Sequence, residues 1–451
     1  MHLPEPIILI FVQFQPLLTQ PSYRKMVLLV CGTLLAHGRR TVTAALKILG
    51  LADEHNWSKY HNLLNRAKWS GLEAATIMLR LLVKTFLAPD APIEIVVDET
   101  LERRWGRKIK KRCHWRDSLA SSHKQNVTTS GLRWLVAALV VKLPWSSRPW
   151  ALPFFSTILT TPKRSTELNL RHRTVTGRTS QLVKWLHRLF KGTGRTVKLI
   201  GDSSYSVIDL GLLCHKLDIT LLAPIRMDAR LFEPAPPRQA HTMGRPRRVG
   251  GRLPLLRTLA LDLSQDWQLV ELDWYGGTKR QMWLLTGTAV WYSTLWADAP
   301  LPVRWVLVRD PKGNLETKAF FSTDLCQRAA SIASDFVKRW NIEVTFEESR
   351  AQLGVESQCQ WNDLAIERST PALLGLYSLV CLFANALYPA GKLPLYETAW
   401  YSKKEATFSD ALGAVRRALW GNFSFETSPS QPDVCLVPRQ VLDKLAFAAC
   451  Y

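Results

Sequence analysis

The chain has 451 residues and a formal net charge of +22, because 59 Lys and Arg face 37 Asp and Glu. Apolar residues make up 47% of it, with 18 Trp, 16 Phe and 10 Tyr, which excludes wholesale disorder and allows a sizeable core. The length predicts about three domains. So basic a chain favours nucleic acid or an anionic membrane surface as its partner, and disfavours a neutral or acidic protein.

Cysteine spacing and hydropathy narrow the class further. The eight cysteines are scattered without any C-x-x-C pair, which argues against a zinc module and a disulfide scaffold and favours free thiols in a reducing cytosol. The apolar run near the N-terminus is short and lacks a basic flank, so we expect no signal peptide. Residues 371–387 are apolar but only at the lower limit for a membrane span, and we expect a buried helix of a soluble protein.

Residues 1–90 show apolar residues at helical spacing. Basic and aromatic residues interleave there, at Trp57, Tyr60, Arg66, Lys68 and Trp69. This pattern fits a helical N-terminal DNA-binding region and fits an ordinary helical bundle equally well.

Residues 91–226 alternate between strand and helix patterns. The predicted elements are a short strand ending on Asp98, strands in 131–145 and 148–159, a helix over 179–191, a strand ending on Asp202, a helix over 207–217 and a strand over 219–225. A mixed sheet with helices fits this order, and the fold class is therefore α/β.

The rest of the chain divides into three parts. Residues 227–330 combine a Pro- and Arg-rich loop with alternating strand patterns and two turn signals, which predicts a β-rich insertion. Residues 331–390 hold most of a long helical pattern over 325–354, followed by the apolar helix. Residues 391–451 are expected to form a helical C-terminal region.

The positive charge is concentrated in one block. Residues 101–200 contain 22 Lys and Arg against three acids, and Asp98 and Asp202 bracket this block. Basic side chains bind a phosphate backbone, while carboxylates hold a divalent cation against a scissile phosphate. Taken singly, each Asp is more often a turn or cap residue. The predicted DNA contacts in the block are Arg103, Arg104, Arg107, Lys108, Lys110, Lys111 and Arg112.

Three carboxylates are the minimal protein set for a two-metal phosphoryl-transfer site. Hard cations prefer oxygen ligands, so His and Cys are not required. Asp98 and Asp202 supply two carboxylates, and the long helix around residue 340 can supply the third. The expected cofactor is Mg²⁺ or Mn²⁺, two ions.

The segment FVKRWNIEVTFEESRAQLG resembles the third-acid signature of bacterial insertion-sequence DDE transposases, Tyr-x-x-Arg-x-x-x-Glu-x-x-x-x-x-x-Lys. Its positions are Phe336, Arg339, Glu343 and Arg350, with Phe replacing Tyr and Arg replacing Lys. IVVDET and LIGDSSYS resemble the first and second Asp motifs of the same family. The resemblance implies an RNase H-like core interrupted by the β-rich insertion, and the triad Asp98, Asp202 and Glu343.

The third-acid helix leaves two points open. Glu347 shares the face of Glu343 and Glu348 is offset, and we expect both to lie on a solvated face. Arg339 lies one turn before Glu343, so its guanidinium contacts a DNA phosphate or pairs with the Glu, and we favour the phosphate. Arg350 is expected to contact DNA as well.

The resemblance implies a DNA transposase that hydrolyses a phosphodiester at the element ends and transfers the 3′-OH into target DNA. Its partners would be the terminal inverted repeats and target DNA, and it would act as a homodimer at the bacterial nucleoid without a membrane. Two alternatives remain: a metal-dependent nuclease or resolvase on the same core, and an inactive transposase-derived DNA-binding protein.

Overall fold

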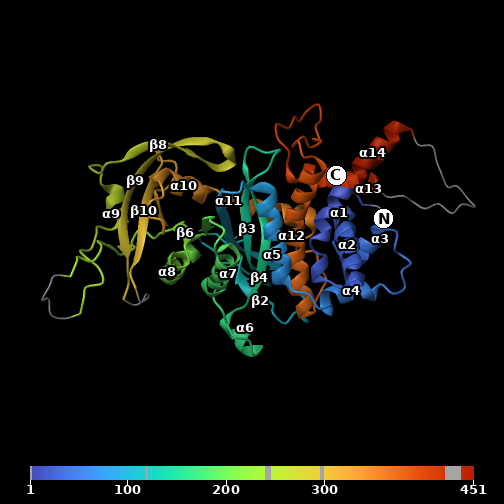
Figure 1. The fold of residues 1–451 in the computed structure, drawn as a ribbon, viewed down its shortest axis with the longest axis horizontal. Coiled ribbons are helices and arrows are strands. Elements are labelled where there is room, and N and C mark those ends of the chain that lie inside the picture. The colour runs from blue at the N-terminus through green and yellow to red at the C-terminus, as the bar shows by residue number, and fades with distance from the viewer. Residues whose placement is uncertain (1–2, 118–119, 123, 239–244, 295–298, 422–437) are drawn as a thin grey trace, which may run out of the picture.

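A mixed sheet forms the centre of the molecule in a computed structural model, which describes residues 3–117, 120–122, 124–238, 245–294, 299–421 and 438–451. Within these residues the sheet has 11 strands, and helices lie before and after it in the chain (Figure 1). The predicted α/β class with an RNase H-like mixed sheet and helical terminal regions is therefore confirmed.

Helices occupy the N-terminal region, as predicted. They are α1 (Glu5–Val12), the 3₁₀ helix η1 (Gln15–Leu17), α2 (Gln20–Leu35), α3 (Val42–Ile48), α4 (Ser58–Asn65) and α5 (Gly71–Phe86). Ser70 caps α5, because its hydroxyl accepts a hydrogen bond from the backbone N–H of Glu73 at 3.2 Å. Leu79 and Leu82 are fully buried on the inner face of α5, which packs on strands of the sheet.

The central strands give the sheet its mixed character. They are β1 (Ile93–Arg103), β2 (Cys113–Arg116), β3 (Thr128–Lys142), β4 (Pro149–Leu159), β5 (Val197–Ile200) and β6 (Ile219–Pro224). β1 runs antiparallel to β3 and parallel to β5, and β5 runs parallel to β6. The helices of this part are α6 (Pro162–Glu167), α7 (Val175–Phe190), η2 (Ser203–Tyr205) and α8 (Ile208–Lys216).

The two Asp residues do not end their strands, contrary to the sequence-based expectation. β1 continues past Asp98 because its pairing with β3 continues, from Asp98 opposite Val136 to Arg103 opposite Gly131. β5 stops at Ile200, and Asp202 is the N-cap of η2. Pairing with a long neighbouring strand can extend a strand beyond the β-branched residues that indicate it in the sequence.

The strands of residues 227–330 extend the core sheet. They are β7 (Leu231–Phe232), β8 (Gln268–Asp273), β9 (Lys279–Trp291), β10 (Leu301–Arg309) and β11 (Lys318–Ser322), with α9 (Leu256–Leu261) and η3 (Tyr275–Gly277) between them. β11 pairs with β6 through Phe321 and Ala223, which makes the sheet continuous. Figure 1 shows β8, β9 and β10 at one end of the molecule and the N-terminal helices at the other.

The long helix predicted over 325–354 is two helices, α10 (Ala329–Val337) and α11 (Trp340–Leu353). The break falls at Lys338 and Arg339, where no Gly or Pro signals it. Lys338 pairs with Glu94 of β1 at 2.7 Å, and Arg339 reaches Asp98 of the same strand. The break therefore lies where two consecutive basic side chains bind acids of one strand.

The apolar segment forms α12 (Asp363–Leu387), followed by α13 (Phe408–Gly421) and α14 (Arg439–Cys450). Among the described residues, α12 is the one helix whose length and composition would suffice for a membrane span. Most of its apolar side chains are buried, and it packs against β4, α1, α5, α11 and α13. Burial on several sides explains its uniform apolarity, because such a helix needs no polar face.

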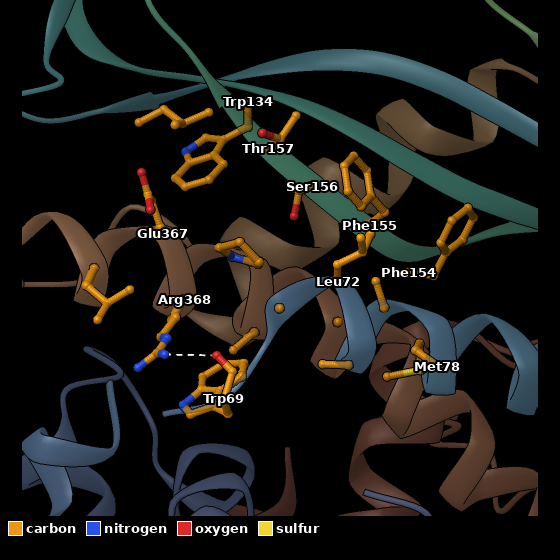
Figure 2. A pocket seen from close by; sticks show the side chains of 18 of the residues that line it. Trp69, Leu72, Met78, Trp134, Phe154, Phe155, Ser156, Thr157, Glu367 and Arg368 are labelled. Atoms are coloured by element: carbon orange, nitrogen blue, oxygen red, sulfur yellow. Dashed lines mark hydrogen bonds between the residues drawn. The ribbon is translucent and has the colours of Figure 1, made fainter. Parts of the chain in front are cut away.

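A cavity of about 590 Å³ lies between the N-terminal helices and the core elements on which they pack. Figure 2 shows it between β4, which carries Phe155, and the helices α5 and α12, which carry Leu72 and Glu367. Arg368 closes one side. It is 8% exposed, donates hydrogen bonds to the carbonyls of Leu63, Leu64 and Trp69, and lies 4.4 Å from the centroid of the Trp69 ring.

We expect Arg368→Met to lower the free energy of unfolding by about 3 kcal/mol, because buried carbonyls of the α4–α5 connection lose their donor. Urea denaturation followed by circular dichroism measures the change. The matched control is Arg66→Met, at an exposed position of the same region, where we expect less than about 0.5 kcal/mol. Equal decreases in the free energy of unfolding for both variants would contradict a role of Arg368 in holding α4 and Trp69 against α12.

Candidate active site

Asp98 and Asp202 are brought together by the parallel pairing of β1 and β5. Val96 lies opposite Ile200 in this register, and each Asp follows two residues later. Asp98 within β1 and Asp202 just beyond β5 are therefore at corresponding positions of neighbouring chain segments. The Asp202 carboxylate accepts a hydrogen bond from the backbone N–H of Ser204 at 2.8 Å, which fixes it at the start of η2. The sequence predicted these two acids as strand ends, and neither of them ends a strand.

Gly201 and Tyr205 explain the local sequence around the second acid. Tyr205 is fully buried, and a Cβ at Gly201 would lie 2.6 Å from its ring. Only glycine permits so close an approach of backbone to ring. The turn after β5 is thereby held tightly, and Asp202 with it.

Arg339 joins the first and third predicted acids. Its Nη1 lies 2.5 Å from Oδ2 of Asp98, and its Nη2 lies 2.8 Å from Oε1 of Glu343, one helical turn further along α11. The side chains of Asp98 and Arg339 are each 15% exposed, whereas that of Glu343 is 36% exposed. Ion pairing, the less favoured of the two sequence-based alternatives, is what the side chain does here.

The pKa of Asp98 depends on its burial and on the charges of the other two acids. Burial raises the pKa of Asp98 to about 7. Arg339 and the N–H of Glu99 oppose the shift, while the charges of Asp202 and Glu343 add to it. The three carboxylates carry more negative charge than the single Arg339 guanidinium compensates. The excess lies around the buried Asp98.

The donor set fits a divalent cation, although the side chains are not gathered around one. Among the described residues, no group of three or more His, Cys, Asp or Glu side chains is arranged as a ready metal cage. The Arg339 guanidinium occupies the space between Asp98 and Glu343. Carboxylate oxygens are the ligands that Mg²⁺ and Mn²⁺ prefer, and the excess negative charge calls for a cation in addition to Arg339.

The raised pKa of Asp98 predicts a pH-dependent stability. An acid whose folded-state pKa lies above its ordinary 3.8 stabilises the fold at low pH, and that contribution is lost as pH rises from about 3.8 through about 7. Asp98→Asn removes the ionisation and keeps an oxygen for Arg339. We expect the variant to melt roughly 2–4 °C higher than the parent at pH 8, with a smaller difference at pH 5. Melting curves in EDTA test this, and a lower melting temperature at pH 8 would contradict it.

Aromatic residues beside the acids were not singled out by the sequence. Tyr275, in the η3 turn between β8 and β9, has its ring centroid 5.9 Å from that of Trp340 at the start of α11. A cavity of about 530 Å³ opens there, lined by Glu94, Arg148, Trp274, Tyr275, Lys338 and Trp340 among others. The turn was predicted from its glycines, but nothing in the sequence places it against α11.

The predicted basic contacts fall into two groups. Arg107, Lys108 and Lys110 are exposed and have no carboxylate partner among the described residues. The others hold partners within the protein: Arg103 with Asp117 and Glu356, Arg104 with Glu102 and the Gln360 carbonyl, Lys111 with Glu367, Arg112 with the Trp105 carbonyl, and Arg350 with Glu356 and Thr100. Arg104 is only 7% exposed, so we leave it out of the proposed DNA surface.

The rival acids on α11 lie apart from this arrangement. Glu347 is exposed, as expected. Glu348 is partly buried rather than fully solvated, and burial together with the Glu347 charge raises its pKa. Neither acts on the pKa of Asp98 among its principal causes. Glu343 remains the candidate third acid.

Comparison with known proteins identifies a family for the chain. The family model described as DDE superfamily endonuclease matches residues 13–281, more than half of the chain. The match includes Asp98 and Asp202 and ends before Glu343. A search of curated proteins gives no match. From the extent of the family match, the chain belongs to the DDE superfamily endonucleases.

Proposed function

We propose that the protein is a DNA transposase, which hydrolyses phosphodiester bonds at the ends of its element and transfers the resulting 3′-OH into target DNA. The observation that carries the proposal is the Arg339 bridge between Asp98 and Glu343, with Asp202 just beyond the end of the neighbouring strand β5. The spacing of Phe336, Arg339, Glu343 and Arg350 supports the transposase assignment within the endonuclease family.

Asp98, Asp202 and Glu343 would hold Mg²⁺ or Mn²⁺, which supplies charge neutralisation at the scissile phosphate and an activated nucleophile. Pairing with β3 fixes Asp98, and the turn after β5 fixes Asp202, so two of the three acids are positioned before substrate binds. Arg339 is free to exchange its carboxylate partners for a phosphate oxygen, which its planar guanidinium binds equally well. Exposed Arg107, Lys108 and Lys110 hold the DNA backbone beyond the site.

Joining two element ends requires two active sites, so we propose a homodimer on the terminal inverted repeats. The test is incubation of the protein with Mg²⁺ and linear DNA carrying the genomic ends that flank its gene. Nicks at the ends followed by joined products support transposition. Nicks without joining favour the nuclease or resolvase alternative, and binding without nicks favours the inactive DNA-binding protein.

Binding to DNA should weaken steeply with salt. The logarithm of the binding constant falls by roughly 0.9 per phosphate neutralised as the logarithm of salt concentration rises. We expect Lys108→Ala and Lys110→Ala each to reduce this slope by about one. Fluorescence anisotropy between 50 and about 300 mM salt measures it. An unchanged slope in both variants would show that this loop does not follow a DNA backbone.

A further inference from the structure

Two loops meet at the C-terminal end of β1, five residues beyond Asp98. Residues 104–112 follow β1, and residues 354–362 connect α11 to α12. The buried Arg104 donates to the carbonyl of Gln360, and the Arg103 guanidinium pairs with Glu356 at 3.5 Å. Ile109 is 3% exposed and belongs to the main core. Packing and hydrogen bonds therefore fix the two loops against each other.

Each loop presents a tryptophan to solvent. Trp105 is 66% exposed and Trp361 is 57% exposed, although their neighbours Arg104 and Gln358 are buried. The backbone of Trp105 is held, because its carbonyl accepts a hydrogen bond from Arg112 at 2.9 Å. Large aromatic side chains exposed on a fixed backbone mark a contact surface.

Positive charge surrounds the two indoles. The ammonium of Lys108 lies 5.2 Å from the ring centroid of Trp361, and Arg107 and Lys110 are exposed on the same loop. None of these three cations has a carboxylate partner within the described residues. A surface of exposed tryptophans and of cations without carboxylate partners suits a polyanion that also carries π-faces, and suits an acidic protein less well.

We propose that Trp105 and Trp361 form a stacking platform for unpaired bases of DNA, whose phosphates are bound by Arg107, Lys108 and Lys110. The proposal rests on the proposed function, since it takes DNA as the substrate. Bases in a duplex stack on one another and cannot reach an indole, whereas every unpaired base offers a π-face. The platform therefore selects a single-stranded segment and tolerates any sequence.

The fold also sets where the unpaired segment lies. β1 runs from Asp98 to Arg103 with a rise of about 3.3 Å per residue, so the platform begins about 17 Å from the first acid. One base pair of duplex DNA advances 3.4 Å along the axis, and about five base pairs span this distance. The unpaired bases should begin about five positions from the cleaved bond.

The experiment compares three DNA probes bound to the full-length protein in EDTA, measured by fluorescence anisotropy: a blunt duplex, the same duplex with a single-stranded tail, and the single strand alone. We expect Trp105→Ala and Trp361→Ala each to weaken binding of the tailed and single-stranded probes about tenfold. Blunt duplex binding should change less than about twofold. Trp105→Phe and Trp361→Phe should retain most of the affinity, because they keep an aromatic face.

The matched control is Trp400→Ala, which removes an 87% exposed tryptophan outside the two loops and should leave all three affinities unchanged. Unaltered binding of the tailed probe in the double alanine variant would overturn the proposal. Equal losses for blunt and tailed probes would overturn it too, since they would indicate a duplex contact. The measurement needs no cleavage. If the parent protein fails to cut DNA but the alanine variants lose affinity for the tailed probe, the proposed function fails and this proposal stands.

Discussion

Asp202→Asn should abolish DNA cleavage while leaving DNA binding within about twofold of the parent protein. The substitution keeps the shape of the side chain and an oxygen that can accept from Ser204, but removes one of the three negative charges. Loss of a metal-ligating carboxylate removes the neutralisation of the scissile phosphate, and we expect cleavage to fall at least about 10³-fold. Nicking of labelled element ends in Mg²⁺ measures the rate, and anisotropy in EDTA measures binding.

Asp209→Asn is the matched control. This acid lies in the first turn of α8, a few residues beyond Asp202, and is exposed. Its loss should leave cleavage within about threefold of the parent, as expected for a surface substitution. Unchanged cleavage by Asp202→Asn would remove the three-acid hypothesis, and loss of binding would show a folding defect instead.

Arg339→Gln should have opposite effects on metal binding and on cleavage. The guanidinium compensates the negative charge of Asp98 and Glu343. After its removal, a metal ion is the cation that can compensate this charge. We expect Mn²⁺ to bind the DNA-free protein about tenfold more tightly, because a cation within a few ångströms no longer repels it. Cleavage should nevertheless fall about 100-fold, since the acids and the phosphate lose the group that positions them. Titration calorimetry at pH 8 and the nicking assay measure the two quantities.

Arg339→Lys tests whether charge or shape matters. Lysine keeps the positive charge but cannot bridge two carboxylates with a planar fork. We therefore expect Mn²⁺ affinity close to that of the parent and cleavage between the parent and Arg339→Gln. Identical Mn²⁺ affinity in all three proteins would show that the ion pair and the metal do not compete.

The elements with strong periodicity were predictable from the sequence, and their ends were not. The helix α7 shows apolar residues at helical spacing, and the buried β3 and α12 carry long apolar runs that indicate buried elements. The length of β1 beyond Asp98 depends on its neighbour β3, and the break between α10 and α11 depends on acids of β1. Both features arise from partners distant in the chain, which local patterns cannot reveal.

In the candidate site too, the motif residues were predictable from the sequence, whereas contacts between distant segments were not. Asp98, Asp202 and Glu343 are predicted from motif spacing, and the parallel register of β1 and β5 explains why the first two lie near each other. The role of Arg339 was left between two alternatives, because the sequence does not show that Asp98 lies within reach of it. Tyr275 and the exposed Trp105 and Trp361 were missed, since their surroundings are assembled from separate segments.

The pairing of β11 with β6 has a consequence for anyone seeking a minimal enzyme. Excising residues 227–330 would appear from the sequence to remove a separate module, yet it would strip β6 of its neighbour on one side. The bared strand carries the fully buried Leu221 and Leu222, and a long apolar edge recruits strands from other molecules. Such a truncation would aggregate rather than yield a smaller catalyst, so shortened variants should retain β10 and β11 as a cover for that edge.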